Sequence, residues 1–263
     1  MENELIPTLK LSLEMTDVLA KIEYNGLKIN LDTLDQIREE YETEMHELEM
    51  RLDSLARDAM GDTPINLASP DDRSMLLYSR KVADKTLWSQ VFNLGHEVRG
   101  STRKPKMRTR MRAKEFKENV RGLTRVVYKT EGQRCPDCDG EGRFHPLRKD
   151  GTLSKAVRVC KTCRGTGVLY RSTGEVAGFK LVPRNPMDVA SAGFKTDKVT
   201  LEERAPELNG AARDFAESYV RYNALRTYLS TFVEGMQNNV DENGFIHPEF
   251  MQCVTATGRL SSR

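Results

Sequence analysis

The fold at the middle of this chain is set by an eight-residue pattern that occurs twice, as Cys135-Pro136-Asp137-Cys138-Asp139-Gly140-Glu141-Gly142 and as Cys160-Lys161-Thr162-Cys163-Arg164-Gly165-Thr166-Gly167. Each Cys-x-x-Cys turn supplies two thiolates, and the glycines behind it tolerate the positive dihedral angles of a tight knuckle. Two such turns, separated by 21 residues, provide the four ligands of a closed tetrahedral zinc site. We therefore expect Cys135, Cys138, Cys160 and Cys163 to bind structural zinc, with no open position for catalysis.

The wider cysteine usage also favours metal binding over disulfides. Five cysteines occur in a chain whose N-terminus lacks the basic and then apolar pattern of a signal peptide. No segment approaches the roughly 20 apolar residues that cross a bilayer. We therefore expect a cytoplasmic protein with no membrane partner. Cys253 is interpreted as a small buried residue, and residues 143–159 can form a short β-hairpin.

A strongly basic segment precedes the cysteines. Between residues 99 and 134 the Lys and Arg side chains are opposed only by Glu115, Glu118 and Glu131, whereas the whole chain has a net charge of +2. Such a run is either a solvated face or a site of electrostatic attachment to nucleic-acid backbone. The balanced composition elsewhere favours attachment to nucleic acid.

Four helices are predicted outside this region. Apolar residues recur at helical spacing from Leu9 to Ile22, before a cap at Asn25-Gly26, and again in a long amphipathic helix from Asp32 to Ala59. Ser69 is a good N-cap for a third helix that begins at Pro70. An aromatic and apolar stripe predicts a fourth helix from Ala211 to Gln237, followed by a tight turn at residues 241–244.

The last stretch, Thr255-Ala256-Thr257-Gly258-Arg259-Leu260-Ser261-Ser262-Arg263, consists mainly of small and hydroxyl residues beside an arginine. Composition alone favours a loop or a strand end, although small residues also allow close approach to a polyanion. The run resembles the Thr-Gly-Arg-Leu-Ser-Ser segment at the palm entrance of family A DNA polymerases, the polymerase I group. Tyr222 to Phe232 is similar to the helix that returns from the thumb in that family.

The resemblance implies a mainly α fold with a small β part. It consists of a long helical hairpin thumb, an inserted β-rich zinc knuckle module, and a return helix leading into the first palm strands. The corresponding domains are residues 1–98, 99–182 and 183–263. The implied function is that of a DNA-binding part of a DNA-directed DNA polymerase, a nucleotidyltransferase that acts in DNA replication.

The family performs phosphoryl transfer with two metal ions held on palm carboxylates. The motifs that carry those carboxylates do not occur in this sequence, so we expect the chain alone to bind primer-template DNA without polymerising it. Mg²⁺ is expected only in a palm and fingers supplied by a continuation or by a second chain. A truncated polymerase and one half of a split polymerase both fit, and the inserted module suggests a phage source.

The resemblance also implies roles for individual residues. Arg259 would reach the minor groove of the primer-terminal base pair, where acceptors shared by all correct pairs allow one arginine to test geometry. Thr255, Thr257, Ser261 and Ser262 would lie near the strand backbones, with Gln252 supporting them. Arg226 would replace basic residues that the family has at neighbouring positions of the return helix.

Four further residues have two interpretations each. Lys195 and Lys198, in a segment similar to the Gly-x-Lys-Thr of family A thumbs, either contact DNA backbone or remain solvated. Asn66 and Ser69 lie at a helix start, whose N–H groups suit the backbone phosphates of primer or template. The neighbouring pair Asp71-Asp72 opposes an anion there, and the alternative is a helix cap alone.

Two other functions remain open. The Cys-x-x-Cys-x-Gly-x-Gly pattern also resembles the zinc repeats of J-domain chaperones, which implies a module that binds unfolded protein. No His-Pro-Asp-type J motif precedes it, and basic residues around the cysteines favour DNA over an apolar peptide: Arg143, Arg148, Lys149, Lys155, Arg158, Lys161, Arg164 and Arg171. The second alternative is a stand-alone zinc-dependent DNA-binding protein.

Overall fold

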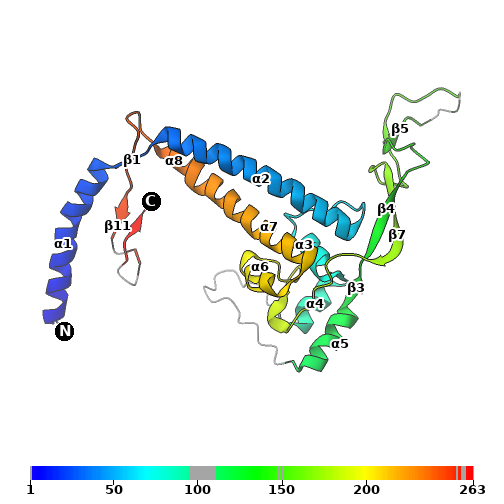
Figure 1. Cartoon of the computed structure of the whole chain (residues 1–263), viewed down its shortest axis with the longest axis horizontal. Coiled ribbons are helices and arrows are strands. Elements are labelled where there is room, and N and C mark those ends of the chain that lie inside the picture. The colour runs from blue at the N-terminus through cyan, green and yellow to red at the C-terminus, as the bar shows by residue number, and fades with distance from the viewer. Residues whose placement is uncertain are drawn as a thin grey trace. The chain divides into compact units, whose positions relative to one another are not determined.

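The computed structural model describes residues 2–94, 111–146, 149, 151–252, 254–255 and 259–262, with side chains from residue 10 onward. It confirms a mainly α fold with a small β part, in which every sheet has two strands (Figure 1). Contacts divide the chain into unit 1, Met1–Leu48 with Arg221–Arg263, and unit 2, Glu49–Val220. The three predicted domains follow a different division and stay a prediction. Among the described residues no helix is long and apolar enough to span a bilayer.

Unit 1 begins with the predicted first helix. Helix α1, Glu2–Asn25, ends at Gly26, whose φ of +65° is the left-handed conformation expected of a glycine cap. Strand β1, Leu27–Lys28, then pairs antiparallel with β10, Phe245–Ile246. The predicted tight turn precedes β10 and is closed by a hydrogen bond from Gly244 N–H to the Asp241 carbonyl at 3.1 Å. The two sequence segments that make up unit 1 are thereby joined.

The long amphipathic helix is also confirmed, as α2, Leu31–Met60. Within unit 1 its first half packs against the return helix, burying Leu34 with Leu229 and Val233. Arg221 donates two hydrogen bonds of 2.6 Å to the Glu44 carboxylate across the same pair. The hydrogen bond to Arg221 lowers the pKa of Glu44, so this carboxylate stays charged.

The predicted fourth helix forms, but its hydrogen-bond pattern changes along its length. Helix α7, Gly210–Thr227, is followed by the π-helical segment η3, Tyr228–Val233, and by α8, Glu234–Asn239. Glu234 N–H donates to the carbonyl of Leu229, five residues earlier, which widens the helix there. The apolar stripe that predicts a helix does not distinguish this π segment from an α-helix.

Unit 2 is organised around an aromatic core. Helix α3, Pro70–Tyr78, begins at the predicted cap, where Ser69 Oγ accepts from Asp72 N–H. Trp88 of α4, Lys85–Val91, is fully buried against Phe92 and Phe194 and donates through Nε1 to the Ala190 carbonyl at 2.9 Å. Unit 2 also contains α5, Ala113–Leu123; α6, Lys198–Arg204; and the 3-10 turns η1, Pro186–Asp188, and η2, Ala205–Glu207.

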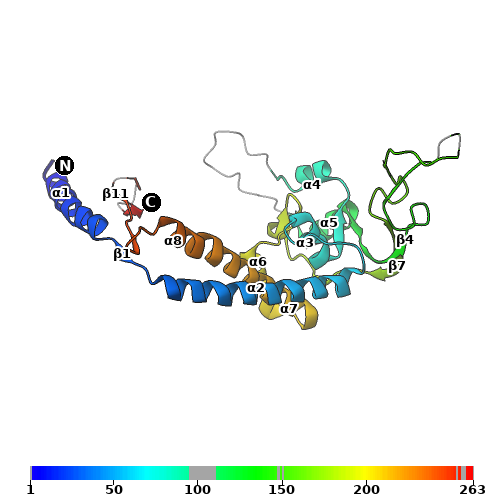
Figure 2. The same ribbon diagram turned by 90° about the horizontal axis from the view of Figure 1, so that it is seen from above.

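The structure describes residues 111–134 of the basic segment. They form a helix and two strands, which the sequence did not predict. Helix α5 buries Phe116 against Phe92, and β3, Thr124–Val126, pairs with β2, Arg80–Val82. Strand β4, Tyr128–Arg134, then pairs with β7, Val168–Val176, as Figures 1 and 2 both show. The predicted short hairpin is present as β5, Arg143–Phe144, and β6, Arg158–Val159. Strands β8, Val189–Ala190, and β9, Gly193–Phe194, form another two-stranded sheet.

Candidate metal centre and nucleic-acid interface

Four buried thiols meet where the repeated pattern predicts a metal site. The Sγ atoms of Cys135, Cys138, Cys160 and Cys163 all lie within 4.8 Å of one another. The Cys135–Cys160 and Cys138–Cys163 separations are 3.8 and 3.6 Å. Zinc with Zn–S bonds of about 2.3 Å in a tetrahedron needs Sγ atoms about 3.8 Å apart. The donor set and its spacing therefore fit a divalent metal ion such as zinc.

The backbone of each knuckle is shaped to surround its thiols. Gly142 N–H donates to Cys138 Sγ at 3.2 Å, and Gly167 N–H donates to Cys163 Sγ at 3.3 Å. These donors stabilise thiolate charge from outside the metal shell, which fixes the orientation of the ligands. Each knuckle thus supplies its own backbone donor, 25 residues from its counterpart.

The two knuckles are also hydrogen-bonded to each other as symmetric partners. Cys135 N–H donates to the Gly167 carbonyl at 2.8 Å, and Cys160 N–H donates to the Gly142 carbonyl at 2.9 Å. A Cβ atom added at Gly142 would lie 2.3 Å from the Gly165 carbonyl oxygen, and one at Gly167 would lie 2.1 Å from that of Gly140. Only glycine fits at these two crossing points.

A polar pair continues this symmetry outside the metal shell. The Thr162 hydroxyl donates to the Asp137 carboxylate, and these residues occupy the same position in the two copies of the pattern. The sequence interpretation did not single them out. The signal was present, because equivalent positions of two symmetry-related knuckles are expected to face one another.

The pKa values of two of the thiols show how the protein environment affects thiolate charge in this cluster. Burial raises the pKa of the Cys138 thiol well above its ordinary value. Burial acts in the same direction on Cys163, but hydrogen bonds from the N–H groups of Gly167 and Gly165, together with those involving Cys138 and Cys160, lower the pKa of that thiol overall. A buried group of four thiolates is stable only with a metal ion that offsets their charge.

Strands β4 and β7 carry the metal centre and are fixed to the helical part of unit 2. Residues that follow α2 form an additional edge to β4, where Gly61 bridges Thr130 and Asp62 N–H donates to the Thr130 carbonyl at 2.9 Å. The Asp62 carboxylate accepts from Gly132 N–H at 2.7 Å. These contacts are long-range in sequence and have no local signature, so the sequence interpretation missed them.

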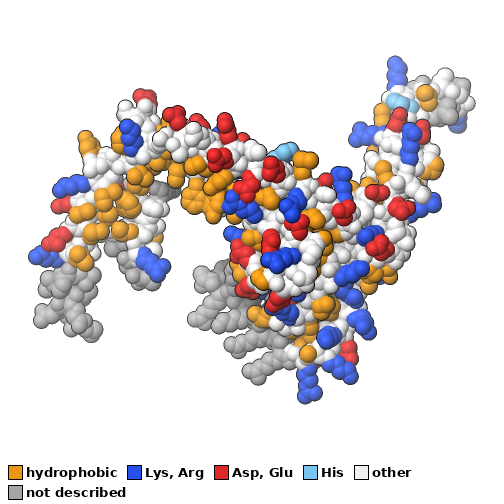
Figure 3. Space-filling model, in the orientation of Figure 1, with side chains coloured by type: hydrophobic (Ala, Val, Ile, Leu, Met, Phe, Trp, Pro, Cys, Tyr) orange, Lys and Arg blue, Asp and Glu red, His pale blue; other side chains and the backbone are white. Residues whose placement is uncertain are grey.

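The surface around the centre carries exposed cations, as expected for contact with a polyanion. The described members of the basic set around the cysteines are all exposed: Arg143, Lys149, Lys155, Arg158, Lys161, Arg164 and Arg171. Arg148 lies outside the described residues. Figure 3 shows blue side chains over the part that holds β4 and β7 and also over α5. Arg134 is already paired with Asp139, 3.2 Å away.

The terminal residues assigned to DNA contact form a small hairpin in unit 1. Strand β11, Phe250–Met251, pairs antiparallel with β12, Ser261–Ser262. Thr255 Oγ1 donates to the Arg259 carbonyl at 2.7 Å, and the Arg259 side chain is exposed. Gln252 directly follows β11, so the hairpin gathers five of the six terminal candidates. Thr257 and Cys253 lie outside the described residues.

The remaining candidates occupy separate local settings. Ser69 caps α3, and Asn66 Oδ1 accepts from Ala68 N–H at 2.9 Å. In unit 2 Lys198 pairs with Glu202 at 3.6 Å, and the Lys195 carbonyl accepts from Tyr78. In unit 1 Arg226 is exposed on α7. In the folded chain Ser69 therefore caps α3, and the Asn66 side chain stabilises the turn that precedes it.

Comparison with known proteins shows that part of the chain is similar to a DNA polymerase. No family model matches the chain. Over 71 residues the chain is 35% identical to DNA polymerase I of Treponema pallidum (strain Nichols). The matched part is 27% of this chain and spans only 7% of the length of that polymerase. The chain is thus similar, over about a quarter of its length, to part of a polymerase I.

Proposed function

We propose that this chain is the DNA-binding part, thumb and palm entrance, of a family A DNA-directed DNA polymerase that acts in DNA replication. The observation that carries the proposal is the 71-residue similarity to a DNA polymerase I. The long paired helices of α2 and α7, and the exposed Arg259 on the terminal hairpin, are consistent with it. A cytoplasmic location accords with this role.

In this proposal the chain binds and orients a primer terminus. Arg259 contacts acceptor atoms in the minor groove that all correct base pairs present alike. Thr255, Thr257, Ser261 and Ser262 lie along the strand backbones with Gln252 behind them, and Arg226, Lys195, Lys198, Asn66 and Ser69 are further backbone contacts. Carboxylates and Mg²⁺ of a palm outside this sequence would supply phosphoryl transfer.

The proposed zinc ion has a structural role. Cys135, Cys138, Cys160 and Cys163 would hold it, leaving no ligand position for substrate. When bound, zinc neutralises the buried thiolates and fixes the two knuckles against each other. The chain's own Arg and Lys side chains around the centre then form a rigid cationic surface for DNA backbone.

The proposed protein partner is the rest of the polymerase, either as a continuation or as a second chain. Helix α1 leaves Leu13 and Val18 with 65% and 48% of their surface exposed. Burying apolar side chains of this size is favourable. The palm would cover them in the complete enzyme.

Binding to primer-template DNA tests the proposal. Fluorescence anisotropy of a labelled primer-template should give an affinity that falls steeply as salt rises, because phosphate contacts release counterions. Arg259→Ala should weaken binding more than Arg57→Ala, which removes another exposed arginine at a position with no proposed contact. Equal effects of the two substitutions, or binding indifferent to salt, would contradict the proposal.

A stand-alone zinc-dependent DNA-binding protein is the second candidate, and the complete four-cysteine centre with its exposed cations favours it. The two candidates differ in where DNA binds. If substitutions of Arg158 and Arg164 abolish duplex binding while Arg259→Ala has no effect, the second candidate replaces the first.

A further inference from the structure

A cavity of 440 Å³ opens on unit 2 between α5, the start of β2 and the segment 180–183. Its floor is apolar, with Phe116, Val120 and Leu181 buried beneath it. Val126 and Val182 also line it and are 37% and 66% exposed. The cavity therefore presents an accessible apolar surface of the size that small ligands occupy in proteins, roughly 300–1,000 Å³.

The rim of the cavity is cationic. Arg80, Lys117, Arg121 and Lys180 line it from three different segments, and no carboxylate is among the lining residues. Within the described part of the chain, Lys117, Arg121 and Lys180 form no ion pair. Four cations around one apolar opening complement a ligand that has an apolar body and negative charges beside it.

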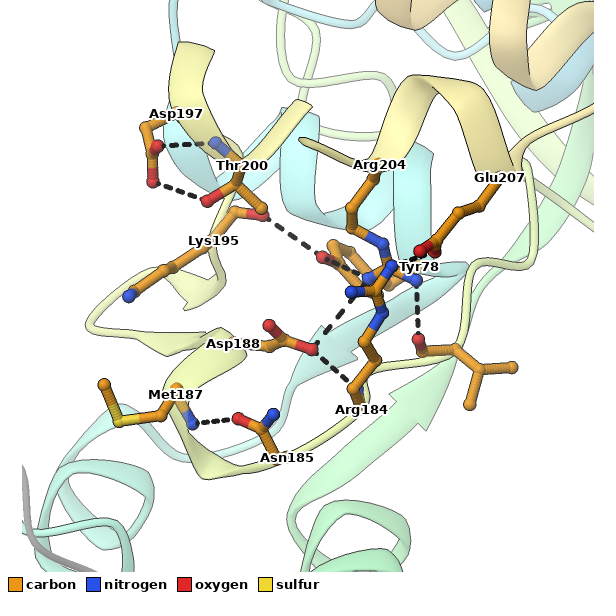
Figure 4. Close-up of polar contacts among 11 residues, drawn as sticks. Tyr78, Arg184, Asn185, Met187, Asp188, Lys195, Asp197, Thr200, Arg204 and Glu207 are labelled. Atoms are coloured by element: carbon orange, nitrogen blue, oxygen red, sulfur yellow. Dashed lines mark hydrogen bonds and ion pairs between the residues drawn. The ribbon is translucent and has the colours of Figure 1, made fainter. Parts of the chain in front are cut away.

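A buried guanidinium, that of Arg204, donates hydrogen bonds to two residues that line this cavity (Figure 4). Arg204 is 7% exposed and donates to Tyr78 Oη at 3.2 Å and to the Val182 carbonyl at 2.9 Å. Tyr78 and Val182 both line the cavity. Asp188 lies 4.0 Å from Arg204, and Arg204 Nε has no hydrogen-bond partner among the described residues. The guanidinium therefore positions two residues of the cavity wall.

The backbone at the rim is held in an uncommon conformation. Ser79 and Lys180 both have φ of +58°, which is unusual for residues other than glycine. Lys180 N–H donates to Ser79 Oγ at 2.9 Å, so the two residues fix one another. At Ser79 this conformation is the left-handed C-cap of α3, whose N–H donates to the Met75 carbonyl at 2.9 Å.

We propose that this cavity binds one unpaired nucleotide of single-stranded DNA, with the base on the apolar floor and the flanking phosphates on the four rim cations. The inference rests on the proposed function, because it takes DNA as the polyanion. Its size suits a single nucleotide, whereas a partner helix needs an extended groove. An apolar floor and phosphate contacts provide no hydrogen-bond readout of the base, so the site accepts any base.

The test compares two single-stranded oligomers by anisotropy with the full, zinc-loaded chain. One is an oligothymidylate of roughly 12 nucleotides, and the other has the same length and charge but abasic sites throughout. We expect the thymidylate to bind about tenfold more tightly, because only it provides bases for the cavity. Equal affinity of the two oligomers would overturn the proposal.

Two substitutions test whether the cavity residues cause the preference for oligothymidylate over the abasic oligomer. Val182→Trp should fill the exposed side of the cavity and lower thymidylate affinity to the abasic level, while abasic affinity stays the same. Lys117→Gln should weaken both oligomers and reduce the salt slope by roughly 0.7, the value for one phosphate contact on a single strand. Lys114→Gln, on the same helix but away from the cavity, is the control. A base preference unchanged in Val182→Trp, or equal effects at Lys114 and Lys117, would overturn the assignment.

Parallel measurements separate this proposal from the proposed polymerase function. Primer-template binding without a base preference on single strands would refute the nucleotide cavity alone. A base preference without primer-template binding would refute the polymerase function and leave the cavity assignment standing. Displacement of thymidylate by an acidic, leucine-rich peptide at lower concentration than by unlabelled thymidylate would assign the cavity to protein and overturn the proposal.

Discussion

The Asp62 carboxylate accepts a hydrogen bond from Gly132 N–H at 2.7 Å and thereby joins the residues after α2 to strand β4. This contact lies on the opposite edge of β4 from β7, next to the bridge between Gly61 and Thr130. The strands that carry the four thiols are therefore attached to the helical part of unit 2 by side-chain and backbone bonds. The attachment of the metal-binding module should depend on this carboxylate.

We predict that Asp62→Ala loosens the base of β4 without affecting metal content. Loss of this hydrogen bond should cost about 1 kcal/mol of local stability, the value for an ordinary hydrogen bond, because the Asp62 carboxylate is exposed to solvent. Hydrogen exchange at residues 128–134 should become faster. Asp58→Ala removes an exposed carboxylate one turn earlier on α2 and should leave this exchange unchanged. If hydrogen exchange at residues 128–134 were unchanged in Asp62→Ala, the backbone hydrogen bonds alone would hold the base of β4 in place.

The metal centre and the aromatic core should respond separately to loss of cysteine. We predict that the double substitution Cys135→Ser and Cys160→Ser reduces zinc from one ion per chain to none. Residues 135–167 should then unfold, because two knuckles without metal bury too little apolar surface to stay ordered. The helices of unit 2 should persist.

Trp88 makes this separation measurable. It is the single tryptophan of the chain and is fully buried against Phe92 and Phe194. Its emission should stay at the same wavelength in the cysteine variant, while elemental analysis reports the missing zinc. A red shift of the emission would mean that the aromatic core depends on the metal centre.

The glycine crossing points provide a third prediction. Gly142→Ala should lower zinc affinity about 10- to 100-fold, the usual range for changes just outside a metal shell, because the new Cβ would lie 2.3 Å from the Gly165 carbonyl oxygen. The matched control is Gly151→Ala. Gly151 also has a positive φ, of +82°, but its Cβ would meet no heavy atom within 4 Å. Zinc competition assays should show weaker zinc binding for Gly142→Ala only. Equal losses of zinc affinity in the two variants would attribute the effect to backbone strain at a positive φ.

Elements that depend on local chemistry could be predicted from the sequence. The Ser69 cap, the Gly26 helix end and the long α2 follow from residue types and spacing within a few turns. The four thiols meet as predicted because the pattern repeats within one compact module. These features need no knowledge of distant contacts.

Features created by distant contacts could not be predicted in the same way. In the sequence, Arg204 is an ordinary cation at the end of a short helix. In the structure it is buried, in contact with Tyr78 and Val182, which are far apart in the sequence. Helix α5 is basic and looks solvated, but Phe116 anchors it to Phe92. The cavity follows from these packing choices, and only the assembled structure reveals it.

The turn after α8 should be sensitive to acid. Asp241 Oδ1 accepts from Phe245 N–H at 2.7 Å and from Asn243 N–H at 2.9 Å. The hydrogen bond from Phe245 N–H is the main cause that lowers the pKa of Asp241 below its ordinary value. The hydrogen bond from Asn243 N–H and the nearby His247 lower this pKa further. A carboxyl whose pKa is depressed by folding stabilises the fold above its unfolded pKa. That contribution is lost as pH falls through the folded value, below about 4.

We predict that exchange of the Phe245 amide accelerates below about pH 4, relative to its intrinsic rate, as Asp241 becomes protonated. Asp241→Asn should keep the turn, because an amide oxygen can accept the same two N–H groups, but it should remove the pH dependence. Glu242→Gln changes the adjacent carboxylate and should leave the acid transition as in the parent chain. NMR measurement of amide exchange from about pH 6 down to about pH 2 covers this window. An acid transition that persists in Asp241→Asn would assign it to another group.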